Sequence, residues 1–323
     1  MRIGSNLESA IANPQSEIVM SRGVHRFALL VAGATFFLII AGANVTSHDA
    51  GLATSDWPLS NGQFFPRMVG NLFWEHGHRL VATTVGLLTI ALAVYLQVRE
   101  RRSWVRWLGW IALTGVIAQG LLGGLTVKMN LPLAVSAAHA TLAQLFFLTT
   151  VSIAVFTSRS WTMQPAAVVA EKGTGSLRHL CVIACVAIFV QLVLGAVLRH
   201  SATWDQYLPT SLLQTHIAGA VVVALTVGTM VISTLRRYGA EKYLTRPAMI
   251  VGLILILQLG LGVVTYFARA ASPSDPQPLN PMISLTVAHV SCGALVFAAT
   301  IVLTLRAFRI LRTERQAYVL APA

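Results

Sequence analysis

The chain has 323 residues, of which 55% are hydrophobic and only 11% are charged, and its mean hydropathy is +0.70. A soluble domain carries roughly 25% charged residues, so this composition excludes an ordinary soluble protein and favours one that lies mostly in lipid. The net charge is +12, but the basic residues form short clusters between apolar runs, which indicates membrane topology and argues against a nucleic-acid-binding face.

Eight apolar runs are long enough to cross a bilayer, for which about 20 residues are needed. We therefore predict an all-α polytopic membrane protein with eight transmembrane helices. The predicted helices are residues 24–46, 72–96, 104–127, 132–157, 179–199, 211–235, 247–268 and 281–308.

The basic residues between these runs predict the orientation. One set of loops and tails holds 18 of the 23 lysines and arginines, and the other set holds five. Loops rich in positive charge stay inside the cell. Both termini are therefore expected in the cytoplasm, and the two longest external loops are 47–71 and 269–280.

A short motif, Gln-x3-Gly, recurs near the outer end of odd-numbered helices. It occurs at Gln119–Gly123, Gln191–Gly195 and Gln258–Gly262, and Gly42 holds the equivalent place in the first helix without the glutamine. Glycine at such places allows helices to approach closely. The repeating unit is a helix pair, which predicts two pseudo-repeated four-helix bundles. The divisions are a cytoplasmic tail at 1–23, an N-terminal half at 24–157, a cytoplasmic linker at 158–178, a C-terminal half at 179–309 and a cytoplasmic tail at 310–323.

Each even-numbered helix carries a histidine near its outer end: His78, His139, His216 and His289. His76, in the same helix as His78, is turned about 160° from it at 100° per residue and is not expected to be a ligand. At about 1.5 Å per residue, the four side chains lie near one plane, roughly 10 Å below the outer boundary. Histidines at equal depth on facing helices suit a metal or heme. Zinc ligands usually cluster at short spacings, whereas these histidines are 61, 77 and 73 residues apart, so heme is favoured over zinc.

The densest polar segment is Trp74–Arg79. Glu75 and His78 are three residues apart and share a helix face, and Glu75 and Arg79 are four apart and can pair. A carboxylate one turn from a ligating histidine can tune it or move protons. The alternative role for Glu75 is a charge at the helix start, paired with Arg79.

With these motifs in place, the sequence resembles the heme A synthase family of cytochrome-oxidase assembly proteins. The resemblance covers nearly the whole membrane part. Its most specific elements are Asp56-Trp57-Pro58 and Glu75-x2-His78-Arg79, and the others are Gly42-Ala43 through Gly51-Leu52, Asn61-Gly62, Phe65-Pro66, Gln119 to Thr126, Ala138-His139, Gln191-x3-Gly195-Ala196-x2-Arg199-His200, His216 and Ala288-His289.

The resemblance implies a heme-dependent oxidoreductase that oxidises the methyl group of heme O to a formyl group through successive hydroxylations. It implies that His78 and His139 bracket the substrate heme O, and that His216 and His289 ligate the iron of a heme b cofactor that passes electrons. Glu75 would be the catalytic acid. Heme O synthase and cytochrome-oxidase assembly factors are the implied partners, a homo-oligomer is a further expectation, and the bacterial cytoplasmic or mitochondrial inner membrane is the implied location.

The chain departs from part of the family in its cysteines. Some members carry cysteine pairs in the external loops after helices 1 and 5, whereas Cys181, Cys185 and Cys292 all lie in apolar runs here. They are expected to pack as small apolar side chains. The loop at 200–210 is also short. These features predict a cysteine-less subclass and leave the four histidines intact.

Three polar groups near the outer mouth, Arg79, Arg199 and His200, are candidates for binding heme propionates through charge-assisted hydrogen bonds. Two other functions stay open. One is a di-heme b-type electron carrier of the quinone oxidoreductase type, which has no need of a carboxylate one turn from a ligand. The other is a transporter of heme or a small solute, which would bind through its histidines weakly and reversibly.

Overall fold

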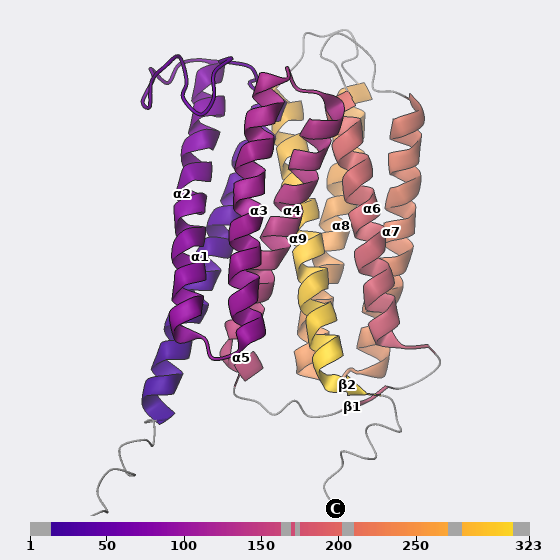
Figure 1. The fold of residues 1–323 in the computed structure, drawn as a ribbon. Coiled ribbons are helices and arrows are strands. Elements are labelled where there is room, and N and C mark those ends of the chain that lie inside the picture. The colour runs from indigo at the N-terminus through magenta and orange to yellow at the C-terminus, as the bar shows by residue number, and fades with distance from the viewer. Residues whose placement is uncertain (1–13, 163–168, 172–174, 202–209, 271–279, 313–323) are drawn as a thin grey trace, which may run out of the picture.

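The computed structural model describes residues 14–162, 169–171, 175–201, 210–270 and 280–312. Within these residues the chain forms long helices that run side by side (Figure 1). The long helices are α1 (Pro14–Ser47), α2 (Asn71–Arg99), α3 (Ser103–Lys128), α4 (Leu133–Thr157), α6 (Leu177–Ser201), α7 (Thr210–Arg237), α8 (Lys242–Ala270) and α9 (Asn280–Ile310).

All eight long helices in the described part are long and apolar enough to cross a membrane. Their outward faces are apolar too; Leu253 and Ile256 of α8, for example, are each 71% exposed. Such faces are stable only where lipid covers them. The predicted class is confirmed: the chain is a multi-pass, all-α integral membrane protein.

Most of the helices extend past the predicted apolar runs, and the start of α8 shows how a distant contact allows this. The predicted run begins at 247, yet α8 begins at Lys242 and contains Pro247. Proline has no N–H for the carbonyl four residues earlier, which is that of Tyr243. Arg306 of α9 supplies the missing donor, because its Nη1 lies 3.1 Å from the Tyr243 oxygen. A contact from a distant helix thus allows this helix to start early.

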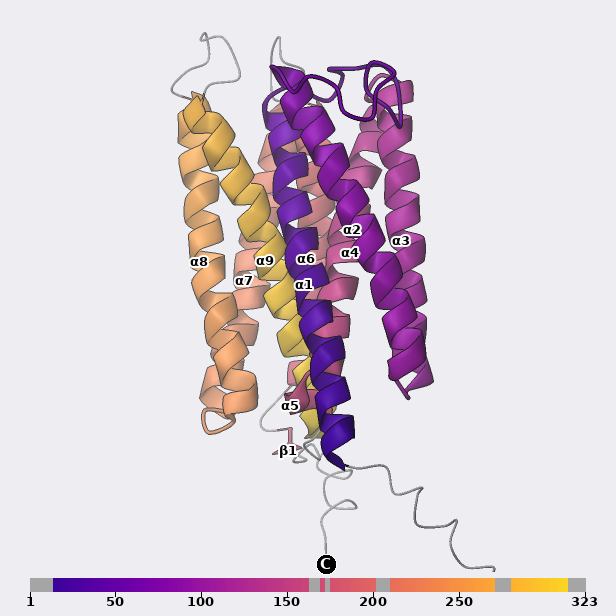
Figure 2. The same cartoon turned by 90° about the vertical axis from the view of Figure 1, so that its left-hand side faces the viewer.

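The helices pack in two groups of four. In one group α1 and α3 each pack against α2 and α4, and in the other α6 and α8 each pack against α7 and α9. The groups meet through α1, α4, α6 and α9, and they lie side by side in Figure 2. One buried apolar cluster lies within the group of α1 to α4, and the other fills the group of α6 to α9 and extends to Ile39 of α1 and Phe147 and Leu148 of α4. The predicted pseudo-repeat of the two halves stays a prediction.

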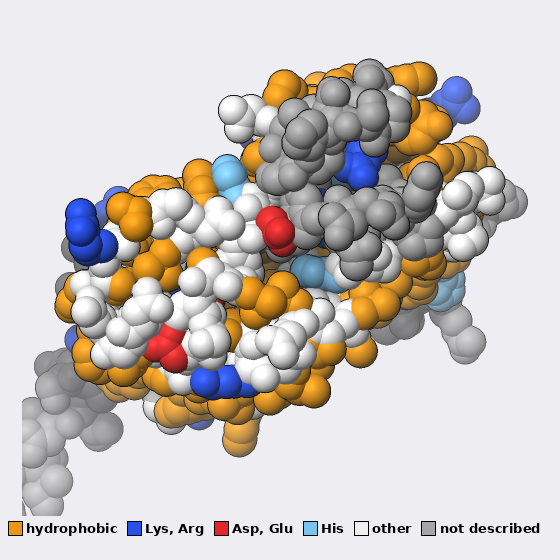
Figure 3. All heavy atoms as spheres, turned by 90° about the horizontal axis from the view of Figure 1, so that it is seen from above, with side chains coloured by type: hydrophobic (Ala, Val, Ile, Leu, Met, Phe, Trp, Pro, Cys, Tyr) orange, Lys and Arg blue, Asp and Glu red, His pale blue; other side chains and the backbone are white. Residues whose placement is uncertain are grey.

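The start of α1 and the end of α9 lie at the same end of the bundle (Figure 1). Residues 48–70 lie at the opposite end, which we call the loop end. Seen from the loop end, the outline of the molecule is longer than it is wide (Figure 3). The assignment of the loop end to the outside of the cell stays the prediction drawn from the basic residues.

A short part of the linker after α4 pairs with the residues that follow α9, at the end of the bundle opposite the loop end. After the short helix α5 (Arg159–Thr162), strand β1 (Val169–Ala170) pairs in parallel with strand β2 (Leu311–Arg312). Arg309 also donates to the carbonyl of Trp161 and lies 4.3 Å from the centre of its ring. Strands of two residues carry no periodic pattern, so the sequence could not predict this connection.

Candidate functional site

The four predicted histidines all lie a short way into helices that start at the loop end. His78 lies seven residues after Asn71 in α2, and His139 lies six after Leu133 in α4. His216 lies six residues after Thr210 in α7, and His289 lies nine after Asn280 in α9. Within each four-helix group, the two helices that carry histidines both pack on the same two neighbouring helices. This placement suits a group held between them.

Each histidine ring packs against a glycine of the preceding transmembrane helix. A Cβ atom placed on that glycine would lie 3.0–3.2 Å from the histidine Cε1, closer than ordinary side-chain contact. The four pairs are Gly42 with His78, Gly123 with His139, Gly195 with His216 and Gly262 with His289. The glycines singled out by the sequence therefore make room for the imidazoles.

The glutamines of the same motif approach the histidines of the C-terminal group. Gln191 Nε2 lies 2.9 Å from the backbone oxygen of His216 and 3.2 Å from its Nδ1. Gln258 Nε2 lies 3.4 Å from Nε2 of His289. In the motif Gln-x3-Gly, the glutamine thus places a polar side chain beside the histidine of the next helix, and the glycine leaves room for its ring.

His216 and His289 face each other across the C-terminal group. Their ring centres are 6.4 Å apart, with an angle of 73° between the ring planes. A metal–imidazole nitrogen bond is about 2 Å long, so two imidazoles on opposite sides of one metal ion place their ring centres roughly 6 Å apart. The spacing of these two rings therefore fits axial ligation of a heme iron.

Several polar atoms around the histidines are buried without a hydrogen-bond partner in the described part of the chain. They include Nδ1 of His78, His139 and His289, and Oε1 of Gln191 and Gln258. A buried polar atom without a partner is costly unless it has a function or another group satisfies it. No cluster of three or more His, Cys, Asp or Glu side chains suited to a metal ion occurs among the described residues. Pairs of histidines suit heme, whose macrocycle supplies the other four ligands.

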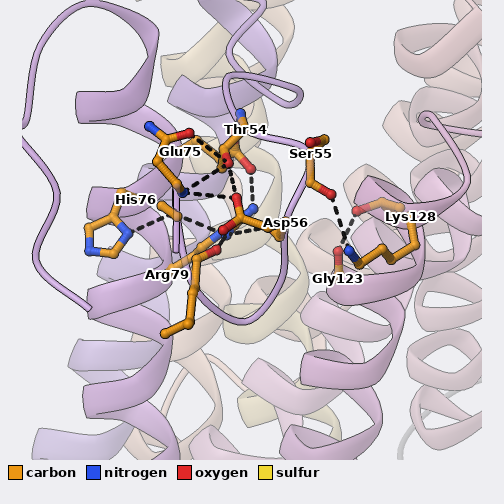
Figure 4. Close-up of polar contacts among 12 residues, drawn as sticks. Thr54, Ser55, Asp56, Glu75, His76, Arg79, Gly123 and Lys128 are labelled. Carbon is orange, nitrogen blue, oxygen red and sulfur yellow. Dashed lines mark hydrogen bonds and ion pairs between the residues drawn. The ribbon is translucent and has the colours of Figure 1, made fainter. Parts of the chain in front are cut away.

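Glu75 is buried, with 4% of its surface exposed, and both of its carboxylate oxygens are engaged. Oε1 pairs with Arg79, one turn further along α2, and Oε2 accepts the backbone amide of Thr54 at 3.0 Å. Nη1 of Arg79 in turn donates to the carbonyls of Asp56 and Leu59 and to the Ser60 hydroxyl (Figure 4). The predicted pair therefore exists, and it also holds the loop.

The 48–70 loop is built around Asp56. The backbone amides of Asn61 and Gly62 donate to its two carboxylate oxygens at 2.9 and 2.7 Å, and the Thr54 hydroxyl also donates. The Thr54 hydroxyl and the amides of Gly62 and Asn61 hold the pKa of the Asp56 carboxyl well below its usual value. The motif Asp-Trp-Pro thus has a structural role that its composition did not reveal.

Three other residues, Lys128, Trp57 and His76, also fasten this loop. Lys128 at the end of α3 donates through Nζ to the backbone oxygen of Ser55 at 3.2 Å (Figure 4). The ring of Trp57 packs against Gly124, because a Cβ on this glycine would lie only 2.8 Å from ring atoms of Trp57. His76, which was not expected to be a ligand, contacts Ser60 Oγ and the Phe64 carbonyl oxygen. The loop therefore closes the loop end of the N-terminal group.

Arg199 lies where the two groups meet at the loop end. Its Nη2 donates to Ser47 Oγ of α1 at 2.7 Å, and Arg269 lies close enough to repel it. No carboxylate among the described residues lies within ion-pair distance of either arginine. Arg199 and His139 lie close enough to His200 to interact with it electrostatically. Two neighbouring cations without an acidic partner in the described ranges suit a carboxylate ligand. The loops 202–209 and 271–279 lie outside the described residues.

Residues 68–301 match the family of the cytochrome oxidase assembly protein. The match spans more than half of the chain and contains Glu75 and all four histidines. This chain belongs to that family. The family resemblance proposed from the sequence is confirmed.

Relatives with described functions agree with this assignment. The chain is similar to the heme A synthase of Bacillus licheniformis, with 23% identity over 77% of this chain and 88% of the relative. It is also similar to the heme A synthase of Shouchella clausii, with 26% identity over 78% of this chain and 90% of the relative. A short stretch resembles the protoheme IX farnesyltransferase of Haloarcula marismortui, with 48% identity over 18% of this chain and 12% of that protein.

Proposed function

We propose that this protein is a heme A synthase, an oxidoreductase that oxidises the methyl group of heme O to a formyl group within the membrane. The facing rings of His216 and His289, 6.4 Å apart, carry the proposal. Their spacing fits a bis-imidazole heme. Membership of the cytochrome oxidase assembly protein family and the similarity to heme A synthases over most of the chain support it.

In this proposal the two histidine pairs have different roles. His216 and His289 hold the iron of heme b between α7 and α9, and His78 and His139 hold the substrate heme O between α2 and α4. The bound heme b supplies electron transfer. The glycines beside the rings fix where the imidazoles lie, which orients the substrate against the rest of the site.

Arg199 and His200 are the stronger candidates for binding propionates. Arg199 has no carboxylate partner in the described ranges and lies between the two groups, so it can meet a propionate from either heme. Arg79 is the weaker candidate because both of its terminal nitrogens already donate within the protein. Arg79 instead holds Glu75 and the loop in place.

Glu75 is the proposed proton-transfer group. It lies three residues before His78 on the same face of α2, and its carboxylate is buried beneath the loop. The pair with Arg79 and the Thr54 amide fix its two oxygens, so any proton it moves is taken up or released at a defined position. The loop over it limits the access of water to the site.

The chemistry of the substrate indicates the partner class. Heme O must come from an enzyme that adds a prenyl chain to heme, and the product must pass to proteins that assemble cytochrome oxidase. We therefore include a heme O synthase and oxidase assembly factors among the proposed partners, at the bacterial cytoplasmic or mitochondrial inner membrane.

The test is pigment extraction from cells that make heme O, with and without this protein. We expect heme A to appear only when the protein is present, and the spectrum and mass of the extracted pigment to show a formyl group. The His139→Ala variant should leave heme O unconverted. A heme-loaded protein that leaves heme O unchanged would refute the proposal and favour the electron-carrier alternative.

A further inference from the structure

A second polar feature lies in the seam between α1 and α9, where the two helix groups meet. It is a cavity of about 530 Å³ that no proposed role of the histidines uses. Its polar lining consists of Asn44 from α1, His48 directly after α1, Trp74 from α2, and Asn280, Ser284 and Ser291 from α9. Ile40, Val287 and Ala288 are among the apolar residues that complete it.

The cavity lies on a different face of α1 from the histidine site. Its α1 residues, Ile40 and Asn44, are four apart and so share one face, and His48 continues that register because its amide donates to the Asn44 carbonyl. Gly42, which packs on His78, is turned about 200° from Ile40 at 100° per residue. The cavity is therefore a neighbour of the N-terminal histidine pair and not part of it.

The lining selects a neutral ligand. None of the residues that line the cavity is Lys, Arg, Asp or Glu. An anionic phospholipid head group would bury a negative charge there without a cation, which is costly. Hydroxyl, amide and imidazole groups beside an apolar wall instead suit an uncharged molecule with a few hydrogen-bonding atoms and an apolar tail.

His48 gives the cavity a defined acceptor. Its Nδ1 lies 2.9 Å from the carbonyl oxygen of Asn44. Because a carbonyl oxygen only accepts, Nδ1 carries the hydrogen, and in the neutral imidazole Nε2 is then an acceptor. The ring is stacked on Trp74, with centres 3.9 Å apart and an angle of 19° between the planes. A flat aromatic wall with a hydrogen-bond acceptor suits a flat ring that carries hydroxyl groups.

We propose that this cavity binds the ring of an isoprenoid quinone in its quinone or quinol form. The inference rests on the proposed oxidoreductase function, because an enzyme of that kind within lipid must exchange electrons with a carrier. A quinone is neutral, flat and soluble in the bilayer. The Ser284 hydroxyl and the Asn280 amide can donate to its carbonyl oxygens, and Nε2 of His48 can accept from a quinol hydroxyl. The isoprenoid chain extends from the apolar side into lipid.

The test measures the binding of decylubiquinone to the purified, heme-loaded protein in lipid nanodiscs by titration calorimetry. Ser284→Phe fills the cavity from an exposed position of α9, and His48→Phe removes the acceptor while keeping a ring against Trp74. Thr114→Phe, at an exposed position of α3, and His179→Phe, at an exposed position of α6, are the matched controls. We expect decylubiquinone to bind at least about tenfold more weakly to the first two variants, with full heme content and unchanged binding to the controls.

Each of the other outcomes overturns the proposal. Unchanged affinity of Ser284→Phe for decylubiquinone shows that the quinone does not enter the cavity. If that variant instead loses heme O binding, the cavity holds the prenyl chain of the substrate. If it changes only the oligomeric state, the cavity faces a second copy of the chain. Pigment extraction tests the synthase function separately, so a failure of one proposal is distinguishable from a failure of the other.

Discussion

Glu75 has two roles, holding the loop and lying next to His78, and a single substitution would disturb both. Its carboxylate pairs with Arg79 and accepts the Thr54 amide, so it holds the loop as well as lying one turn from His78. The pair is also buried, with Glu75 only 4% exposed, so its loss would affect stability as well as activity. A stability measurement must therefore accompany any activity measurement at this position.

We expect Glu75→Gln to reduce the conversion of heme O at least about tenfold, the low side for a lost proton-transfer group. Glutamine keeps an acceptor for Thr54 but loses the charge, which should cost about 2 kcal/mol of stability. Heme b content should stay normal. Asp56→Asn is the control, because it loosens the same loop from outside the membrane and leaves Glu75 unchanged. Equal loss of conversion in both variants would assign Glu75 to the loop rather than to proton transfer.

The two histidines of the C-terminal group are tested by spectroscopy. We expect the purified protein to show a low-spin bis-histidine heme b, because the rings of His216 and His289 face each other at ligating separation. His216→Ala and His289→Ala should each lose most of this heme in a pyridine hemochrome assay. His179→Ala, an exposed histidine of α6, should retain it. Full heme b retention in both site variants would be incompatible with the assignment.

At the scale of helices, two glycines of α8 can be compared directly, because one contacts a histidine and the other does not. A Cβ on Gly262 would lie 3.0 Å from His289 Cε1, whereas nothing lies within 4 Å of a Cβ on Gly260. Gly262→Ala should displace the imidazole and weaken heme b binding about tenfold to a hundredfold, the size seen when the surroundings of a metal ligand change. Gly260→Ala should bind heme b normally. Alanine favours a helix over glycine by about 1 kcal/mol, so helix propensity cannot explain a loss.

Equal heme b binding by the two alanine variants would show that the glycine does not position the ligand. The same comparison is available in the N-terminal group. A Cβ on Gly123 would meet His139, whereas one on Gly120 in the same helix would meet nothing within 4 Å. There the readout is the binding of heme O.

The loop responds to pH through Asp56. Because the folded state lowers the pKa of this carboxyl, it favours the ionised form. Its contribution to loop stability is therefore complete above the ordinary value of about 3.9 and is lost as the pH falls through the lower folded value. We expect pepsin to cut the exposed Phe64–Phe65 segment slowly at pH 4.5 and faster near pH 2. Asp56→Asn should be cut fast at both values, and a wild-type loop cut equally fast at both would contradict this role.

At the scale of the whole molecule, the sequence could predict whatever depends on local pattern. Hydropathy located the eight helices, and the recurrence of histidine and Gln-x3-Gly identified which residues would meet. The features that the sequence could not predict depend on contacts between distant segments. Arg306 extends α8 past Pro247, the Asp56 hydrogen bonds shape the loop, and His48 stacks on Trp74. No pattern within one helix encodes such contacts, so the cavity between α1 and α9 appeared only in three dimensions.

The last prediction concerns how the molecule lies in the membrane. The start of α1 and the end of α9 lie at one end of the bundle, and the 48–70 loop lies at the other. A measurement that locates one end of the bundle relative to the membrane therefore also locates the other. The 18 lysines and arginines against five predict that the termini lie in the cytoplasm. A phosphatase fused within 47–71 should therefore be active outside the cell, and one fused within 158–178 should be inactive. A fluorescent reporter that folds only in the cytoplasm serves as the reciprocal control. The reverse pattern would place the four histidines, Glu75 and Arg199 near the cytoplasmic face, and heme O would then have to be oxidised on that side.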